Sequence, residues 1–427
     1  MLRDNRPHPP YTKIRFMNNA HPFARPTYVM AKPAGSLCNL ACRYCYYTEK
    51  ARLYPNNPRH VMSDELLEEF TRQYIEMQTT PEVLFTWHGG ETLMRPVAFY
   101  KRALELQRRY ANGRRIDNAI QTNGTLITDE WAQFFKENNF LVGVSIDGPK
   151  EYHDAYRRTR SGRPSWFGVM QGIRILEKHG VEWNALAVVN ALNAEHPEEF
   201  YRFFKDLNCR FIQFTPVVER LYRHPDGRTL ASPIEGAVAE VADFSVSPQQ
   251  WGNFLCRLFD LWVQEDVGEY FIQIFDSTLA GWMGVTPGVC SMGETCGHAG
   301  VIEFNGDVYA CDHFVFPEFK LGNIKEKSLM EMMYAPAMLQ FGENKRALLT
   351  RQCKECEYLS ACHGECPRLR FAESADGERG HNYLCEGYKM FFNHIAPYMD
   401  FMKHQLQNHK APAEVMQWVK NGMPRYR

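Results

Sequence analysis

The chain has 427 residues and a formal net charge of −1, and the absence of any block of like charges excludes the usual basic surface for nucleic acid. The first 25 residues lack the apolar core of a signal peptide, and no uncharged apolar run reaches the about 18 residues that span a bilayer. We therefore expect a cytoplasmic protein that binds neither nucleic acid nor membranes.

Residues 27–276 alternate short apolar segments with longer amphipathic segments. The segments expected to form strands are Tyr28–Lys32, Val83–Trp87, Ala119–Thr122, Leu141–Ile146, Asn184–Val189, Phe211–Thr215 and Phe271–Phe275. The segments expected to form helices are Asp64–Met77, Val97–Tyr110, Asp129–Glu137, Trp166–Lys178, Glu198–Leu207 and Pro248–Gln264. Ser63 and Thr128 are expected N-caps. Repeated strand–helix units predict a full or partial parallel barrel, with its active site at the carboxyl ends of the strands.

Three cysteines follow the first expected strand, in the sequence Cys38-Asn-Leu-Ala-Cys42-Arg-Tyr-Cys45. Three thiolates can hold three irons of a [4Fe-4S] cluster and leave the fourth iron open to another ligand. A zinc knuckle would normally need a fourth Cys or His at close spacing, and the nearest downstream histidine, His60, follows a loop rich in Pro and Asn. We therefore interpret the three cysteines as ligands of a cluster with one open iron.

The spacing Cys-x3-Cys-x2-Cys, with Tyr44 before the last cysteine, resembles the signature of the radical S-adenosylmethionine (SAM) superfamily. The resemblance implies an α/β fold built on a partial (β/α)6 barrel, in which the open iron binds the amino and carboxylate groups of SAM. It also implies that one electron from the cluster splits the sulfonium bond of SAM. The resulting 5′-deoxyadenosyl radical then takes a hydrogen atom from the substrate, and Tyr44 is expected beside this site.

The second expected strand is followed by His88-Gly-Gly-Glu91, which resembles the Gly-Gly-Glu segment that binds the methionine amino group in this superfamily. Gly90 would let the backbone approach the ligand, and Glu91 would accept a charge-assisted hydrogen bond from the ammonium. Thr92 stands where many relatives have proline. An ordinary turn is the alternative interpretation of this segment.

Three further residues are expected at the SAM site. Ser145 lies at the end of the strand Val142-Gly-Val-Ser-Ile-Asp-Gly148 and could bond the cosubstrate, while Arg157 could meet its carboxylate. Val218 matches a position where relatives place an apolar residue against the adenosine. The alternatives are a plain strand end, a solvated charge and a core valine.

Residues 277–395 are rich in Gly, Cys and Pro, with short expected strands at Val301–Phe304 and Asp307–Ala310. Eight grouped cysteines lie here: Cys290, Cys296, Cys311, Cys353, Cys356, Cys362, Cys366 and Cys385. Eight thiolates can saturate two [4Fe-4S] clusters, and a pair of zinc sites is the alternative. The two remaining cysteines, Cys209 and Cys256, are expected to be small core residues.

The eight cysteines resemble the SPASM extension of radical enzymes that modify peptides. This resemblance implies that Cys290, Cys296, Cys311 and Cys366 hold an inner cluster, nearer the active site. It implies that Cys353, Cys356, Cys362 and Cys385 hold an outer cluster, for a total of three [4Fe-4S] clusters in the chain. The expected parts of the chain are an N-terminal extension (1–26), the partial barrel (27–276), the SPASM domain (277–395) and a C-terminal helix and tail (396–427).

Five segments between Tyr28 and Tyr388 resemble the anaerobic sulfatase-maturating enzymes. They are Lys32-Pro-Ala-Gly-Ser-Leu-Cys38, Gln121-Thr-Asn-Gly-Thr-Leu-Ile127, Leu141-Val-Gly-Val-Ser-Ile-Asp-Gly-Pro149, Val308-Tyr-Ala-Cys-Asp312 and Leu321-Gly-Asn-Ile324. The resemblance implies oxidation of the Cys or Ser of a Cys/Ser-x-Pro-x-Arg motif to Cα-formylglycine. The implied partners are an unfolded or nascent sulfatase and an electron donor such as flavodoxin or ferredoxin.

Asp312, directly after Cys311, is the expected catalytic base. A substrate that has lost hydrogen from Cβ becomes a carbonyl-type product only if its thiol or hydroxyl also loses a proton, which a carboxylate can accept while a nearby cluster takes the electron. Asp312 could instead be an ordinary turn residue. Two other functions stay open: a SPASM enzyme that forms thioether or carbon–carbon crosslinks, and a zinc-ribbon binding protein without catalysis.

Overall fold

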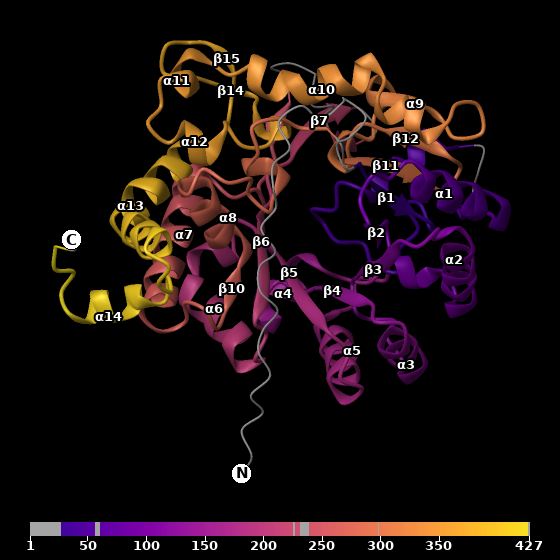
Figure 1. Cartoon of the computed structure of the whole chain (residues 1–427), viewed down its shortest axis with the longest axis horizontal. Coiled ribbons are helices and arrows are strands. Elements are labelled where there is room, and N and C mark those ends of the chain that lie inside the picture. Colours follow the sequence, from indigo (N-terminus) through magenta and orange to yellow (C-terminus); the bar gives the residue numbers. More distant parts are fainter. Residues whose placement is uncertain (1–26, 56–59, 225–226, 231–238, 298, 426–427) are drawn as a thin grey trace.

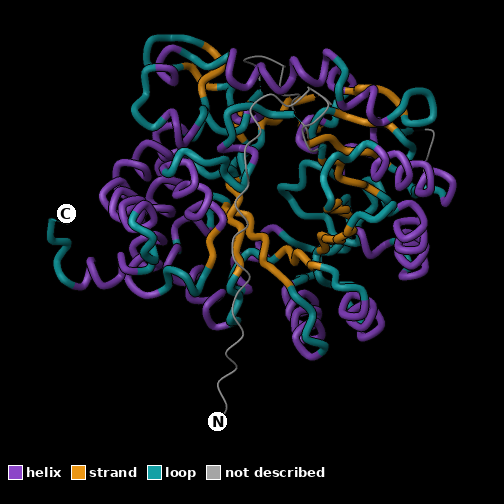
Figure 2. The backbone as a smooth tube through the Cα atoms, viewed as in Figure 1, coloured by secondary structure: helices purple, strands orange, loops and turns teal. Residues whose placement is uncertain are grey.

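The computed structural model describes residues 27–55, 60–224, 227–230, 239–297 and 299–425 (Figure 1). The expected N-terminal extension, residues 1–26, lies outside the described residues. One sheet of ten strands, in the order β10-β6-β5-β4-β3-β2-β1-β11-β12-β13, runs through the molecule, and Figure 2 shows how these strands curve. Among the described residues, no helix is both long and apolar enough to cross a membrane.

The first six strands pair in parallel, as the alternation of strands and helices predicts. They are β1 (Tyr28–Lys32), β2 (Glu82–Trp87), β3 (Arg115–Thr122), β4 (Leu141–Ser145), β5 (Trp183–Val189) and β6 (Phe211–Pro216). The helices between and after them, which lie outside the curved sheet in Figure 1, are α1 (Asp64–Glu76), α2 (Val97–Tyr110), α3 (Asp129–Glu137), α4 (Lys150–Tyr156), α5 (Trp166–Lys178), α6 (Pro197–Asp206) and α7 (Pro248–Glu265). The expected partial barrel is confirmed.

Local signals in the sequence explain where these elements begin and which face they bury. The side chains of Ser63 and Thr128 accept hydrogen bonds from Leu66 N and Trp131 N, so both expected N-caps are confirmed. Strand β2 buries alternate residues, and α1 buries one apolar face against the sheet. Each fully buried apolar side chain of this kind stabilises the fold by about 1.5–3 kcal/mol.

The expected strand Phe271–Phe275 is wrong over most of its length. Strand β10 comprises only Phe271–Ile272, which pairs in parallel with β6, and helix α8 (Gln273–Trp282) begins at the next residue. Phe275 is buried in the core from this helix. A short apolar run does not distinguish a buried strand from a buried helix, so only the packing decides.

The C-terminal part continues the sheet of the barrel. Strand β11 (Ala299–Glu303) pairs in parallel with β1, and β12 (Asp307–Tyr309) and β13 (Lys320–Asn323) follow in antiparallel order. A single hydrophobic core includes Val29 from the barrel together with Ile302 and Phe391 from this part. The cysteine-rich part therefore shares the core of the barrel.

Further helices follow in this part of the chain. They are α9 (Leu329–Met333), α10 (Pro336–Ala347), α11 (Arg351–Lys354), α12 (Leu359–Cys362), α13 (Cys385–Gln407) and α14 (Glu414–Lys420). Two small sheets complete the fold: β7 (Arg220–His224) with β8 (Gly227–Leu230) and β9 (Glu240–Val241), and β14 (Ala372–Glu373) with β15 (Arg379–His381). The expected borders after residues 276 and 395 fall inside α8 and α13, so neither border is a linker.

Candidate active site and cluster sites

The first three cysteines lie on the loop after β1, and all thirteen cysteines of the chain are free thiols. Cys38 Sγ accepts hydrogen bonds from Leu40 N (3.3 Å) and from Asn123 Nδ2 (3.7 Å). Burial is the main cause that raises the pKa of Cys38 to about 11 and that of Cys42 to about 12, and neighbouring thiols act in the same direction. Thiolates in this loop therefore need a compensating cation, and three neighbouring thiols, one of which accepts two hydrogen bonds at its sulfur, fit an iron–sulfur cluster.

The Gly-Gly-Glu segment packs directly against this cysteine loop. Gly90 N donates to Gly35 O (2.8 Å), and Glu91 N donates to Leu37 O (2.7 Å). A Cβ atom at Gly90 would lie only 2.2 Å from Leu37 O, a separation that no side chain tolerates. The structure thus shows one reason for this glycine, since the two backbones touch each other, and its expected approach to the ligand stays a prediction.

Glu91 is 1 % exposed and connects the ends of β2 and β3. Its carboxylate accepts hydrogen bonds from Leu93 N (2.9 Å), Thr122 Oγ1 (2.8 Å) and Asn123 N (2.7 Å). Burial raises the pKa of Glu91, and these three bonds oppose that effect. Because a carboxylate has about four acceptor positions, one remains for an ammonium group.

Replacing Gly90 by alanine tests the contact between the two loops. The added Cβ must displace the carbonyl of Leu37, so we expect Gly90→Ala to lower the stability by about 1–3 kcal/mol. We also expect SAM affinity, measured by equilibrium dialysis of the reconstituted protein, to fall at least about tenfold, since about 1.4 kcal/mol of lost binding gives that factor. Gly288→Ala is the matched control, because its added Cβ meets no atom nearer than Ser277 Oγ at 4.0 Å. Equal SAM affinity in both variants would contradict this prediction.

Ser145 ends strand β4 beside the last residues of β3. Its Oγ accepts a hydrogen bond from Gln121 Nε2 (2.9 Å), so the hydroxyl can still donate to another group. The Gln121 side chain passes over Gly143, where a Cβ would lie 2.1 Å from Gln121 Oε1. Val218, in contrast, packs into the main hydrophobic core, and its expected contact with adenosine stays a prediction.

Arg157 is 7 % exposed, so the alternative of a solvated charge is wrong. Its Nε and Nη2 donate to the two oxygens of Asp147 at 2.9 and 3.1 Å. Tyr44 also donates its hydroxyl to Asp147, and the guanidinium lies 5.4 Å from the centre of the Tyr44 ring. Tyr44 and Arg157 thus brace the last cysteine of the triad through a buried carboxylate, and the expected contact between Arg157 and SAM stays a prediction.

Asp312 lies between the two halves of the molecule, paired with Lys32 from the end of β1. The Lys32 side chain is fully buried, whereas 16 % of the Asp312 side chain is exposed, so the carboxylate is the accessible member of the pair. Tyr46 donates its hydroxyl to Asp312 Oδ2 (2.5 Å), and Lys32 Nζ lies 3.2 Å from His88 Nδ1. Burial raises the pKa of Asp312, but Lys32, His88 and His313 together outweigh burial and hold the pKa below its usual value. The carboxylate is therefore unprotonated at neutral pH.

Two more charged groups lie next to this network. Arg368 forms a buried ion pair with Glu219, which follows β6, and its guanidinium lies 4.7 Å from the centre of the Tyr46 ring. Lys50 Nζ lies 3.2 Å from the centre of the Phe316 ring. Burial lowers the pKa of Lys50 to about 8. Residues from the first cysteine loop, the barrel and the C-terminal part thus surround Asp312.

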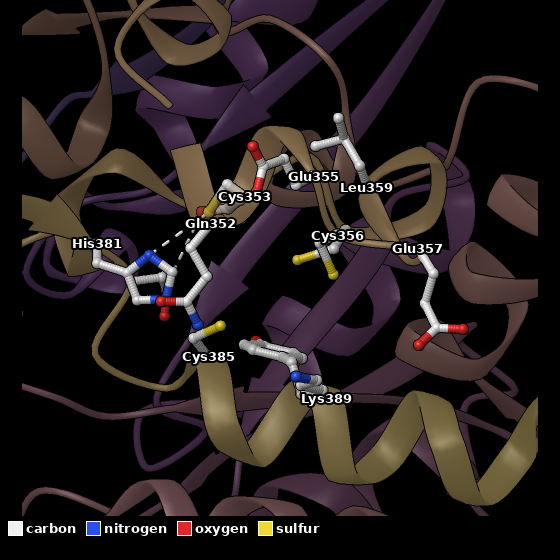
Figure 3. A pocket seen from close by; sticks show the side chains of 13 residues that line it. Gln352, Cys353, Glu355, Cys356, Glu357, Leu359, His381, Cys385 and Lys389 are labelled. Carbon is white, nitrogen blue, oxygen red and sulfur yellow. Dashed lines mark hydrogen bonds between the residues drawn. The ribbon is translucent and has the colours of Figure 1, made fainter. Parts of the chain in front are cut away.

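Four cysteines of the C-terminal part line one pocket of about 350 Å³. They are Cys353, Cys356, Cys362 and Cys385, the four expected for the outer cluster. Figure 3 shows the sulfurs of Cys353, Cys356 and Cys385 turned toward the space between α11 and the start of α13. His381 Nδ1 lies 3.6 Å from Cys353 Sγ, and Thr350 Oγ1 lies 2.9 Å from the same nitrogen.

The other four cysteines are electrostatic neighbours of one another. Cys290 and Cys366 both raise the pKa of Cys311 after the larger effect of burial, and Cys290 and Cys296 act likewise on Cys366. Within the described ranges, no three Cys, His, Asp or Glu side chains converge closely enough to hold a single metal ion. The four outer thiols around one pocket and the four neighbouring inner thiols fit two four-iron clusters.

The structure also places the two isolated cysteines and several residues that the sequence analysis missed. Cys209 lies in the main core and Cys256 packs against it, so both are core residues as expected. The missed residues of the site are Lys32, Tyr46, His88, Gln121, Asn123 and Asp147. Most of them end a strand or follow one directly, and that position in a parallel barrel was the available signal.

Comparison with known proteins identifies two family models in the chain. The model of the radical SAM superfamily matches residues 33–204, and the model of the SPASM iron–sulfur cluster-binding domain matches residues 291–357. The chain is 66 % identical over 401 residues to the serine-type anaerobic sulfatase-maturating enzyme of Bacteroides thetaiotaomicron. The aligned residues cover 94 % of this chain and 97 % of that protein. It is 33 % identical over 375 residues to the cysteine-type enzyme of Clostridium perfringens, covering 87 % of this chain and 97 % of that protein.

The fold is similar to a solved structure described as native anSMEcpe with bound AdoMet and Kp18Cys peptide. The TM-score is 0.78 at 31 % sequence identity, and the match covers 89 % of this chain and 99 % of that chain. The similarity therefore extends over most of the length of both chains.

Proposed function

The chain belongs to the anaerobic sulfatase-maturating enzymes, and we propose that it oxidises a serine of a sulfatase to Cα-formylglycine. Serine is proposed as the main target because the chain is 66 % identical to a serine-type enzyme and 33 % identical to a cysteine-type enzyme. The observation that carries the proposal is the accessible carboxylate of Asp312, held by Lys32 and Tyr46 between the first cysteine loop and the inner cysteines. The target motif is Ser-x-Pro-x-Arg, with cysteine in place of serine as a slower substrate.

Three groups of cysteines hold the iron in this proposal. The first cluster is held by Cys38, Cys42 and Cys45, and the inner and outer clusters by the two groups of four described above. When bound, the clusters and SAM would provide the radical chemistry that removes a hydrogen atom from the substrate Cβ and an acceptor for one electron. Glu91, Ser145 and Gln121 orient the cosubstrate at the carboxyl ends of β2, β4 and β3.

Asp312 completes the oxidation as the proton acceptor. The hydroxyl proton of the substrate passes to the Asp312 carboxylate, one electron leaves toward the inner cysteines, and the C–O single bond becomes a double bond. Together with the hydrogen atom removed from Cβ, the serine has then lost two hydrogens. Lys32 and Tyr46 fix the orientation of the carboxylate during this transfer.

We further propose an unfolded or nascent sulfatase as the substrate, because the target side chain must reach a carboxylate that is only 16 % exposed. A small electron-transfer protein such as flavodoxin or ferredoxin supplies the electron that starts each turnover. Reduced, iron-binding thiols suit the cytoplasm, which is the proposed compartment. The net charge of −1 favours neither nucleic acid nor an anionic membrane as a partner.

Mass spectrometry of a model peptide tests the proposed function. After anoxic incubation with SAM and a reductant, a Ser-x-Pro-x-Arg peptide should lose about 2 mass units and a Cys-x-Pro-x-Arg peptide about 18, the latter because sulfur is also replaced by oxygen. An aminooxy probe should label both products, since both carry an aldehyde, and the serine peptide should show the higher kcat/KM. A product that has lost 2 mass units but does not react with the probe would support the crosslinking alternative.

A further inference from the structure

A turn with unusual backbone angles joins the two auxiliary groups of cysteines. Between Cys362 and Cys366, three consecutive residues have left-handed φ angles: His363 (49°), Gly364 (68°) and Glu365 (55°). Residues other than glycine adopt this conformation at a cost, and runs of it are rare. Because the turn carries one ligand of the outer cluster and one of the inner cluster, whatever holds it also sets the spacing of the two clusters.

One side chain binds all three carbonyls of this turn. Arg370 donates Nε to Gly364 O (2.9 Å), and it donates Nη2 to His363 O (2.8 Å) and Glu365 O (3.2 Å). The fit is close, because a Cβ at Gly364 would lie 2.8 Å from Arg370 Nη2. The planar fork of a guanidinium can reach several acceptors in fixed directions, which an ammonium on a flexible chain does less well.

The same arginine is connected to the loop that carries another ligand. Its Nη1 donates to Lys345 O (2.5 Å) on α10. The side chain of Lys345 is itself buried, with 1 % of the residue exposed, and its ammonium donates to the carbonyls of Cys290 (3.0 Å), Ser291 (2.5 Å) and Gly293. The buried Lys345 and the partly buried Arg370 therefore tie the Cys290 loop to the turn between Cys362 and Cys366.

The charge of Arg370 acts on both groups of cysteines. Thiols of the outer group, Cys353 and Cys362, and of the inner group, Cys296 and Cys366, all interact electrostatically with its guanidinium. A fixed positive charge stabilises the reduced, more negative form of a nearby iron–sulfur cluster, and so it raises the reduction potential.

We propose that Arg370 and Lys345 form a cation clamp that positions ligands of both auxiliary clusters and raises the reduction potentials of these clusters. Arg370 and Lys345 are positioning residues, since their donors bind backbone carbonyls of the ligand loops. The raised potentials make the auxiliary clusters better acceptors of the electron that leaves the substrate. This inference rests on the proposed assignment of the cysteines to an inner and an outer cluster.

The test uses the full chain with Cys38, Cys42 and Cys45 replaced by alanine, so that all iron belongs to the auxiliary clusters. After anoxic reconstitution this background should hold about 8 irons. Adding Arg370→Gln should lower the iron content and shift the midpoint potentials of the remaining clusters to more negative values, measured by redox titration with electron paramagnetic resonance. No sulfatase peptide is present, so a failure of the proposed function would not affect this result.

Three companion variants make the outcome decisive. Arg346→Gln removes the same charge from the exposed residue next to Lys345, which pairs with Glu294 and Glu343, and it should leave iron and potentials unchanged. Lys345→Met should reproduce the loss of iron from the other side of the clamp. Arg370→Lys keeps the positive charge but lacks the planar guanidinium, so it should restore the potentials more than the iron content. It replaces Arg370→Gln in the test if that variant does not fold. Background iron content and potentials in Arg370→Gln would overturn the proposal. If that variant does not fold, background iron content in both Arg370→Lys and Lys345→Met would overturn it.

Discussion

The variant with alanine at Cys38, Cys42 and Cys45 is expected to lose all detectable reductive cleavage of SAM. Only these three cysteines form a group with fewer than four thiols, so only their cluster leaves an iron open to the cosubstrate. Iron content after anoxic reconstitution should fall from about 12 to about 8, because the eight auxiliary thiols are unchanged. The measurements are 5′-deoxyadenosine by liquid chromatography and iron by colorimetric assay.

The control for this experiment is a cysteine outside the three groups. Cys256 packs against the main core on α7, so Cys256→Ala should keep the iron content and the rate of SAM cleavage. If 5′-deoxyadenosine forms at the wild-type rate in the triple variant, the assignment of the first cluster is wrong. If the triple variant retains only about 4 irons, the model of two auxiliary clusters is wrong.

The second expected result separates hydrogen abstraction from product formation. Asp312→Asn keeps the size of the side chain but removes its ability to accept a proton at neutral pH. General-base assistance typically contributes 10²–10⁴-fold in rate, or about 3–5 kcal/mol of barrier, so formylglycine formation should fall by about that factor. Cleavage of SAM should continue, because the first cysteine loop is unchanged. 5′-Deoxyadenosine should therefore accumulate in excess over aldehyde.

Asp307→Asn is a matched control for the catalytic aspartate. Asp307 begins β12, five residues before Asp312, and its carboxylate is held by Lys320 (2.7 Å) and Asn323 Nδ2 (2.8 Å), not by Lys32 or Tyr46. Asp307→Asn should make aldehyde at nearly the wild-type rate. Wild-type aldehyde formation by Asp312→Asn would show that Asp312 is not the base. The iron content of Asp312→Asn is measured in parallel, so that damage to the neighbouring Cys311 is detected.

The sequence by itself predicted the elements whose local signals are strong. The hydrophobic periods of the barrel strands and helices, the caps Ser63 and Thr128, and the cysteine triad Cys38, Cys42 and Cys45 all lie within short segments of the chain. Such signals depend on the residue and its near neighbours, which is why they are readable without a structure. The family resemblance added the division of the eight auxiliary cysteines, and the outer four do line one pocket.

Only the tertiary structure decided which distant residues share a site. The Lys32–Asp312 pair joins positions 280 residues apart, and it exists because β11 adds to the sheet edge at β1. Phe271–Phe275 became mostly helix for a similar reason, since packing against the core and not local pattern fixed its conformation. The hydrogen bonds of Arg157 to Asp147, and of Arg370 to the left-handed turn at 363–365, likewise form only in the folded chain. A buried charge is stable only when a polar or oppositely charged group lies next to it, and the fold determines which group that is. The spacing of residues in the sequence does not identify the partner.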